Sequence, residues 1–164
     1  MSREAALWPP SEGQVLCMTS FGIDPLSAES PESPCLGAMA LHPVAESVPR
    51  ARRWFRKFIA PYDQGCPVED CVLLISELVT NAIVHGKSDE PWIVRVRWFR
   101  VGASLRVEVH NPGLPENVRL RCPEADDSHG RGLLLVDFIA DSWHTGASRF
   151  GGTVVSSEIA GVWQ

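Results

Sequence analysis

Three polar side chains that could do chemistry recur at intervals of four residues in the sequence ISELVTNAIVHG, residues 75–86. They are Glu77, Asn81 and His85. With 3.6 residues per helical turn, this spacing aligns them in one stripe along a helix whose other positions are largely apolar. A carboxylate can accept a proton from a hydroxyl nucleophile or a water, and an amide oxygen is a hard ligand for Mg²⁺. The stripe is compatible with chemistry at a phosphate, and equally with an exposed polar face of an ordinary helix.

Two glycines, Gly130 and Gly132, flank the expected start of a later helix in the sequence HGRGLLLVDFIAD. Glycines let backbone N–H groups approach an anion closely, and the N-terminus of a helix carries a partial positive charge. A phosphate could therefore rest at this position. A tight turn in front of a helix would show the same pattern.

A third candidate is Asn111, which ends an alternating apolar segment and precedes Pro112 and Gly113. Its side chain could contact the edge of a ligand at the end of a strand. Asn-Pro-Gly is equally an ordinary turn sequence, because each of these residues favours turns for its own steric reason.

The elements that must position these residues follow from the apolar periodicity. Helices are predicted over 45–62, 67–85 and 130–144, and strands over 35–43, 91–100, 104–112 and 151–160, with a further strand beginning near 143–145. The polar connection 112–129 is long, which is typical of functional or mobile loops. Helices grouped against a mostly antiparallel sheet indicate an α+β fold built as a two-layer sandwich.

Composition narrows the function. The chain has 164 residues, of which 45% are hydrophobic and 21% charged, as expected for one globular domain with a core. The formal net charge of −5 argues against a nucleic-acid binder, and no run reaches the ~18 apolar residues that span a bilayer. Without a recognisable secretion signal, a cytoplasmic protein is expected. Residues 1–34 are rich in Pro, Ser, Glu and Gly and are predicted to be a disordered arm, with 35–164 as the folded domain.

Basic residues crowd the polar side of the first predicted helix: Arg50, Arg52, Arg53, Arg56 and Lys57. The plain interpretation is a solvated cationic face. The alternative is a docking surface for an acidic protein partner.

In their order and spacing, the motifs resemble those of the GHKL ATPase superfamily. These motifs are ELVTNAIVHG on a helix, NPG at a strand end, GRGL at a helix start and GGT before the last strand. Within the superfamily, the chain is similar to the bacterial anti-sigma-factor serine/threonine kinases, over roughly residues 40–160. The resemblance implies the Bergerat ATP-binding fold, in which three main helices cover one face of a mixed, mostly antiparallel sheet. It also implies ATP and Mg²⁺ as ligands.

The resemblance further implies roles for the residues of the helical stripe. Glu77 would be the catalytic general base, and Asn81 would be the Mg²⁺ ligand. His85 would lie at the far end of the same helix, near the nucleotide pocket.

The other motifs would hold the nucleotide. Asn111 and Gly113 would form the adenine-binding box, with Thr153 supporting the adenine end, and residues 114–129 would be the ATP lid. The phosphates would meet the second glycine box, which consists of Gly130, Arg131, Gly132 and Leu133.

One box departs from the family pattern, which is Asp-x-Gly-x-Gly. This chain has Asn111 in place of the aspartate and Pro115 in place of the second glycine.

Three functions are compatible with these features. The leading hypothesis is a kinase that phosphorylates a small anti-anti-sigma (STAS-type) protein and sequesters a sigma factor by partner switching. It would have no direct contact with nucleic acid or membrane, and a homodimer is compatible with it. The second is a protein-binding regulator that keeps the fold but turns ATP over slowly or not at all; Asn111 and Pro115 favour it, and the Glu77–Asn81 pair opposes it. The third is the detached nucleotide-binding half of a histidine kinase, which is weakened because no phosphoacceptor helix precedes residue 40.

Overall fold

The computed structural model describes residues 34–62, 65, 67–118 and 132–163. The elements follow the predicted order. They are β1 (Cys35–Leu41), α1 (Ser47–Ile59), α2 (Val68–His85), β2 (Val94–Val101), β3 (Ser104–Asn111), the 3-10 helix η1 (Pro115–Asn117), α3 (Gly132–Ile139), β4 (Ser142–Ala147) and β5 (Thr153–Ile159).

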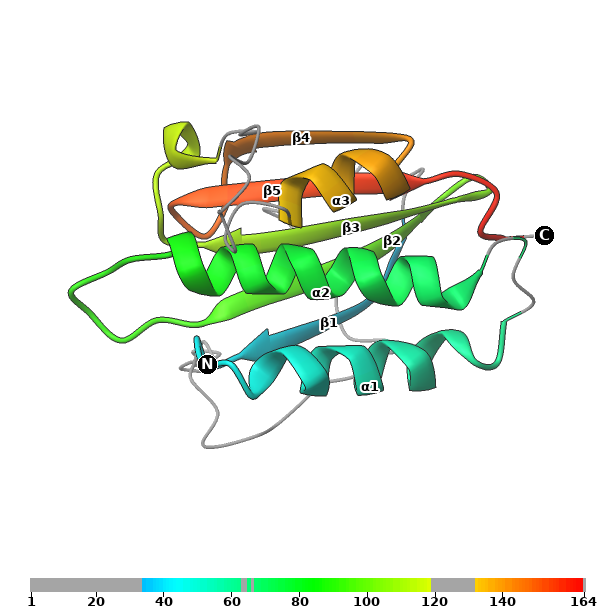
Figure 1. Ribbon diagram of the computed structural model, residues 1–164, viewed down its shortest axis with the longest axis horizontal. Coiled ribbons are helices and arrows are strands. Elements are labelled where there is room, and N and C mark those ends of the chain that lie inside the picture. Colours follow the sequence, from blue (N-terminus) through cyan, green and yellow to red (C-terminus); the bar gives the residue numbers. More distant parts are fainter. Residues whose placement is uncertain (1–33, 63–64, 66, 119–131, 164) are drawn as a thin grey trace, which may run out of the picture.

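The strands of the described chain form one sheet with the order β1-β2-β3-β5-β4. Helices α1, α2 and α3 lie against one face of this sheet (Figure 1). The predicted α+β two-layer sandwich is thereby confirmed. Every neighbouring pair of described strands is antiparallel, so the mixed character expected of the sheet is not present in them.

The hairpin of β2 and β3 supplies the middle of the core. Successive side chains of a strand point to opposite faces of the sheet, and Val96 of β2 stands opposite Val109 of β3. Both are buried on the helix side, together with Val94 and Val107. The alternation in the sequence therefore predicts correctly which side chains the helices cover.

Helix α1 packs by one face. Ala51, Phe55 and Ile59, each one turn apart, are fully buried, as expected of an amphipathic helix. The ring of Phe55 meets Trp98 of β2 edge to face, with 6.0 Å between the ring centroids. Gly37 of β1 makes room for the indole, since a β-carbon there would lie 2.6 Å from the Trp98 Nε1.

The third helix is shorter than the sequence predicts. It ends at Ile139, and β4 begins at Ser142. The reason is Asp141, whose backbone N–H donates to the Glu158 carbonyl and whose Oδ2 accepts a 2.6 Å bond from the Ala160 N–H. These two bonds attach Asp141 to the end of β5, so the chain leaves the helix and joins the sheet.

Several predictions fall on segments outside the described residues. The predicted arm, residues 1–34, is represented only by Pro34. Of the expected lid, residues 114–129, the structure describes Leu114 to Val118, which includes η1. No helix in the described ranges is long and apolar enough to cross a membrane.

Candidate active site

Helix α2 positions the polar stripe by burying the opposite side of the helix. Ile75, Leu78, Val79 and Ala82 are buried beneath it. Along the stripe the environment changes from one end to the other, because Glu77 and Asn81 are half-buried and His85 is exposed. The stripe is therefore not a uniform solvent-exposed face, and its first two members lie beneath another element.

That element is α3. Its first residue, Gly132, stands directly over the stripe: a β-carbon on it would lie 2.8 Å from Glu77 Oε2, 3.1 Å from Asn81 Oδ1 and 3.2 Å from Asn81 Nδ2. Two of the candidate motifs thus form one site, in which the N-terminus of α3 meets a carboxylate and an amide. Leu133 follows and is buried. Gly130 and Arg131 lie outside the described residues.

The carboxylate of Glu77 has a shifted acidity. Burial raises the pKa of Glu77, and the positive charge of Arg52 on α1 lowers it in part, with a raised pKa as the net result. A carboxylate with a raised pKa is a stronger base than an exposed one. This suits a group that must take a proton from a hydroxyl.

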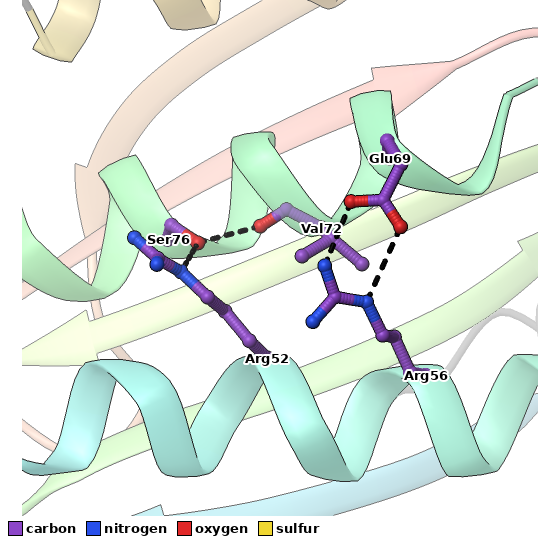
Figure 2. Close-up of polar contacts among 5 residues, drawn as sticks. All are labelled: Arg52, Arg56, Glu69, Val72 and Ser76. Atoms are coloured by element: carbon purple, nitrogen blue, oxygen red, sulfur yellow. Dashed lines mark hydrogen bonds and ion pairs between the residues drawn. The ribbon is translucent and has the colours of Figure 1, made fainter.

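A hydrogen-bonded chain holds Arg52 next to α2. The Arg52 Nε donates to Ser76 Oγ at 2.6 Å, and the Ser76 hydroxyl in turn donates to the Val72 carbonyl at 2.7 Å (Figure 2). Ser76 is buried and immediately precedes Glu77. One turn away, Arg56 pairs with Glu69 at 2.7 Å in the same view. From the sequence, Arg52 is identified only as one of the basic residues of the first predicted helix, and Ser76 is not identified. No local pattern in the sequence connects either residue with Glu77.

Asn81 has an unsatisfied amide. Its Nδ2 is buried and has no hydrogen-bond partner among the described residues. A buried N–H without an acceptor is unfavourable by about 1–3 kcal/mol and calls for an explanation. An acceptor oxygen of a ligand at the N-terminus of α3 would provide it.

The turn after β3 forms a second part of the site. The Asn111 Oδ1 accepts a 2.7 Å bond from the Gly113 N–H, and the Thr153 hydroxyl donates a 2.5 Å bond to the Gly113 carbonyl. Asn111 and Thr153 face each other in the ladder of β3 and β5. The three residues that the resemblance places at the adenine end are therefore connected to one another.

This turn lies against the end of α2. A β-carbon on Gly113 would stand 2.7 Å from the His85 carbonyl oxygen, and one on Gly86 would stand 3.0 Å from the Asn111 Cβ. The backbone of His85 thus adjoins the turn, while its side chain is exposed. The role expected for the imidazole remains a prediction.

A further glycine fixes the turn from the other side. Gly152, just before β5, has φ of +77°, and a β-carbon on it would run into the backbone of Asn111 and Pro112. The sequence shows this residue only as part of a Gly-Gly turn. Its contact with the Asn111 turn is not local and becomes visible only in the folded chain.

Comparison with known proteins agrees with the fold. Residues 41–157 match the family model of the histidine kinase-like ATPase domain. This chain belongs to that family, whose members have the GHKL type of ATP-binding domain. No curated protein matches the chain.

The donor set fits the ligands that this family implies. ATP phosphates would supply acceptors for the unsatisfied Asn81 amide and for the N-terminus of α3. Mg²⁺ in nucleotide sites is held by one or two protein oxygens together with the phosphates, so it needs no dedicated cage of protein ligands. Within the described ranges, no group of three or more His, Cys, Asp or Glu side chains gathers as a metal cluster.

Proposed function

We propose that this chain is a serine/threonine kinase of the anti-sigma-factor type, which transfers the γ-phosphoryl group of ATP to a small anti-anti-sigma (STAS-type) protein. The observation that supports this most is the contact of Gly132 with both Glu77 and Asn81. It joins a base, an amide ligand and a helix N-terminus in one place. Phosphoryl transfer requires little beyond such positioning and electrostatic stabilisation.

In this proposal, Glu77 accepts the proton of the target hydroxyl. The hydroxyl oxygen forms a bond to the γ-phosphorus, the bond from that phosphorus to the β–γ bridging oxygen breaks, and ADP leaves. Mg²⁺, when bound, supplies positive charge at the phosphates, and Asn81 would be its protein ligand. The raised pKa of Glu77 brings the base closer to neutral pH, where general catalysis is most efficient.

The remaining residues would hold the substrate. Gly132 and Leu133, with Gly130 and Arg131 before them, would receive the phosphates. Asn111, Gly113 and Thr153 would receive the adenine of ATP. His85 would lie between the phosphate end and the adenine end of the site.

The cationic face of α1 supports an acidic protein partner. Arg50, Arg53 and Lys57 are exposed there, whereas Arg52 and Arg56 have contacts with α2. The partners would be the STAS-type substrate and a sigma factor, bound alternately, in a cytoplasmic regulatory protein of transcription.

The test is a phosphorylation assay with labelled ATP, Mg²⁺ and candidate STAS-type proteins. Wild type should label the partner on Ser or Thr. Glu77→Gln should reduce the rate by about 10²–10⁴-fold, as expected for loss of a general base, and should still bind the partner in a pull-down. Wild-type rates in the variant would remove Glu77 from the mechanism, and no labelling by wild type with any partner would contradict the kinase proposal.

A second function is favoured by one observation. An amide, Asn111, stands where the family has an acid, and its oxygen is already bonded to Gly113. A regulator that binds protein partners and turns ATP over slowly would need no strong contact with the adenine of the nucleotide. In that case the pull-down would succeed for wild type while labelling would stay at background.

A further inference from the structure

The amide of Asn111 is held in one orientation. Its side chain lies 2.7 Å from the Gly113 nitrogen, and a backbone N–H can only donate. The atom that faces Gly113 must therefore be Oδ1, which fixes the positions of the oxygen and the nitrogen. A side chain at position 113 would crowd this oxygen, because a β-carbon on Gly113 would stand 2.8 Å from Oδ1.

The other end of the amide is the group that remains for a ligand. The bond from the Gly113 N–H engages Oδ1 and not Nδ2. The nitrogen carries two N–H donors and no acceptor. An aspartate with the same turn would instead keep a second carboxylate oxygen at this position, which is an acceptor with negative charge.

The two classes of purine differ at position 6 in the same way as the amide differs from the carboxylate, one offering a donor and the other an acceptor. Adenine carries an amino group at position 6, which donates, and so pairs with a carboxylate oxygen. Guanine and hypoxanthine carry a carbonyl oxygen at position 6, which accepts, and so pairs with an amide N–H.

We propose that Asn111 reads the purine through its amide N–H, so that this chain accepts nucleoside triphosphates with a 6-carbonyl group at least as well as ATP. The inference rests on the proposed function, because it takes Asn111 as the residue that contacts the base. It goes beyond that function by naming the substrate class. Thr153 preserves the arrangement, since its hydroxyl bond to the Gly113 carbonyl holds the turn that orients the amide.

The experiment is calorimetric titration of the full chain with Mg-ATP and Mg-ITP. ITP differs from ATP at position 6 and lacks the 2-amino group of GTP, so it isolates the contact in question. Wild type should bind ITP with an affinity equal to or above that for ATP. Asn111→Asp should lower the ratio of ITP affinity to ATP affinity by about tenfold or more, because a charged acceptor attracts the amino group and repels the carbonyl.

Two further measurements complete the test. Asn111→Ser, which is too short to reach the base in the same way, should bind both nucleotides weakly and without preference, and circular dichroism should show that both variants are folded. A wild-type preference for ATP of more than tenfold, or an unchanged ratio in a folded Asn111→Asp protein, would overturn the inference while leaving nucleotide binding intact. No binding of either nucleotide by folded wild type would instead contradict the proposed function, and the inference with it.

Discussion

Gly132 stands against the carboxylate of Glu77 so closely that a β-carbon at this position would lie 2.8 Å from Oε2. The two residues belong to α3 and α2, and neither helix contains the site alone. A side chain at position 132 would occupy the space between the base and the helix N-terminus. We therefore expect that even a methyl group at position 132 disturbs the site.

Gly132→Ala should reduce phosphoryl transfer by about 10²-fold, because a misplacement of about 1 Å in catalytic groups has an effect of that size. The three atoms nearest to the added methyl group would be the ends of the Glu77 and Asn81 side chains, which can move. The free energy of unfolding should change by less than about 1 kcal/mol, since the better helix propensity of Ala offsets some crowding.

Gly146→Ala is the matched control, because a β-carbon on Gly146 would have no neighbour within 4 Å. Rates and denaturant unfolding of both variants give the comparison. Equal rates in the two variants would mean that the Gly132 contact does not position Glu77.

Glu77→Gln should stabilise the protein at neutral pH. The pKa of Glu77 is raised in the folded state by burial, so the folded state binds the proton more tightly than the unfolded state does. Its contribution to stability is therefore most favourable at low pH and is lost as the pH rises through the folded pKa. The gain should be below about 1 kcal/mol at pH 8, since the side chain is only half-buried, and should vanish at acidic pH.

Urea unfolding at several pH values measures this effect. Glu69→Gln serves as the control, because hydrogen bonding to Arg56 lowers the pKa of Glu69 and its removal should not stabilise the fold. A pH-independent difference between Glu77→Gln and wild type would contradict the assignment.

Arg52→Gln should shift the acid limb of the pH–rate profile to higher pH. The positive charge of Arg52 lowers the pKa of Glu77 against the effect of burial, so its loss lets that pKa rise further. The active carboxylate form would then be reached only at a higher pH.

Arg53→Gln should leave the limb in place, because Arg53 is exposed on the same helix and does not contribute to the Glu77 pKa. Rates normalised to each variant's own maximum remove differences in partner binding. Superimposable profiles for Arg52→Gln and wild type would show that this charge does not tune the base.

Gly152→Ala should destabilise the fold more than Gly151→Ala. Both residues have positive φ, +77° and +85°, a conformation that costs an L residue about 1–2 kcal/mol. Only at Gly152 would the β-carbon also collide with backbone, 2.5 Å from Pro112 Cα, which should add about 1–3 kcal/mol. Thermal unfolding of the two variants measures the effect of the collision. Equal losses of stability in both would show that the backbone of the turn moves to accommodate the β-carbon.

The sequence predicted the layers well because they depend on local periodicity. The alternation in the β2–β3 hairpin and the four-residue spacing on α2 predict which faces are buried. The structure shows both patterns of burial. The spacing of Glu77 and Asn81 also placed them on one side of a helix. What covers them could not be derived from spacing alone, since the contact with Gly132 depends on how α3 packs.

The same limit explains the differences. The end of α3 depends on Asp141 binding Ala160, a pair that no local pattern connects. The influence of Arg52 on Glu77 depends on how α1 and α2 lie side by side. Asn111 was expected to contact the adenine of the nucleotide, and only the folded chain shows that its oxygen is engaged by the Gly113 N–H.

The strand order also affects when the Asn111 turn can form while the chain is being synthesised. β5 follows β4 in the chain but lies between β3 and β4 in the sheet. During translation, β3 and its Asn111 turn therefore emerge well before the strand that supports them. Pairing over such a separation is slow to form, and until it forms β3 has an open edge that can pair with other chains. The Asn111 turn should thus form late and all at once, and the emerging chain should be most prone to aggregation just before Thr153 pairs with Asn111.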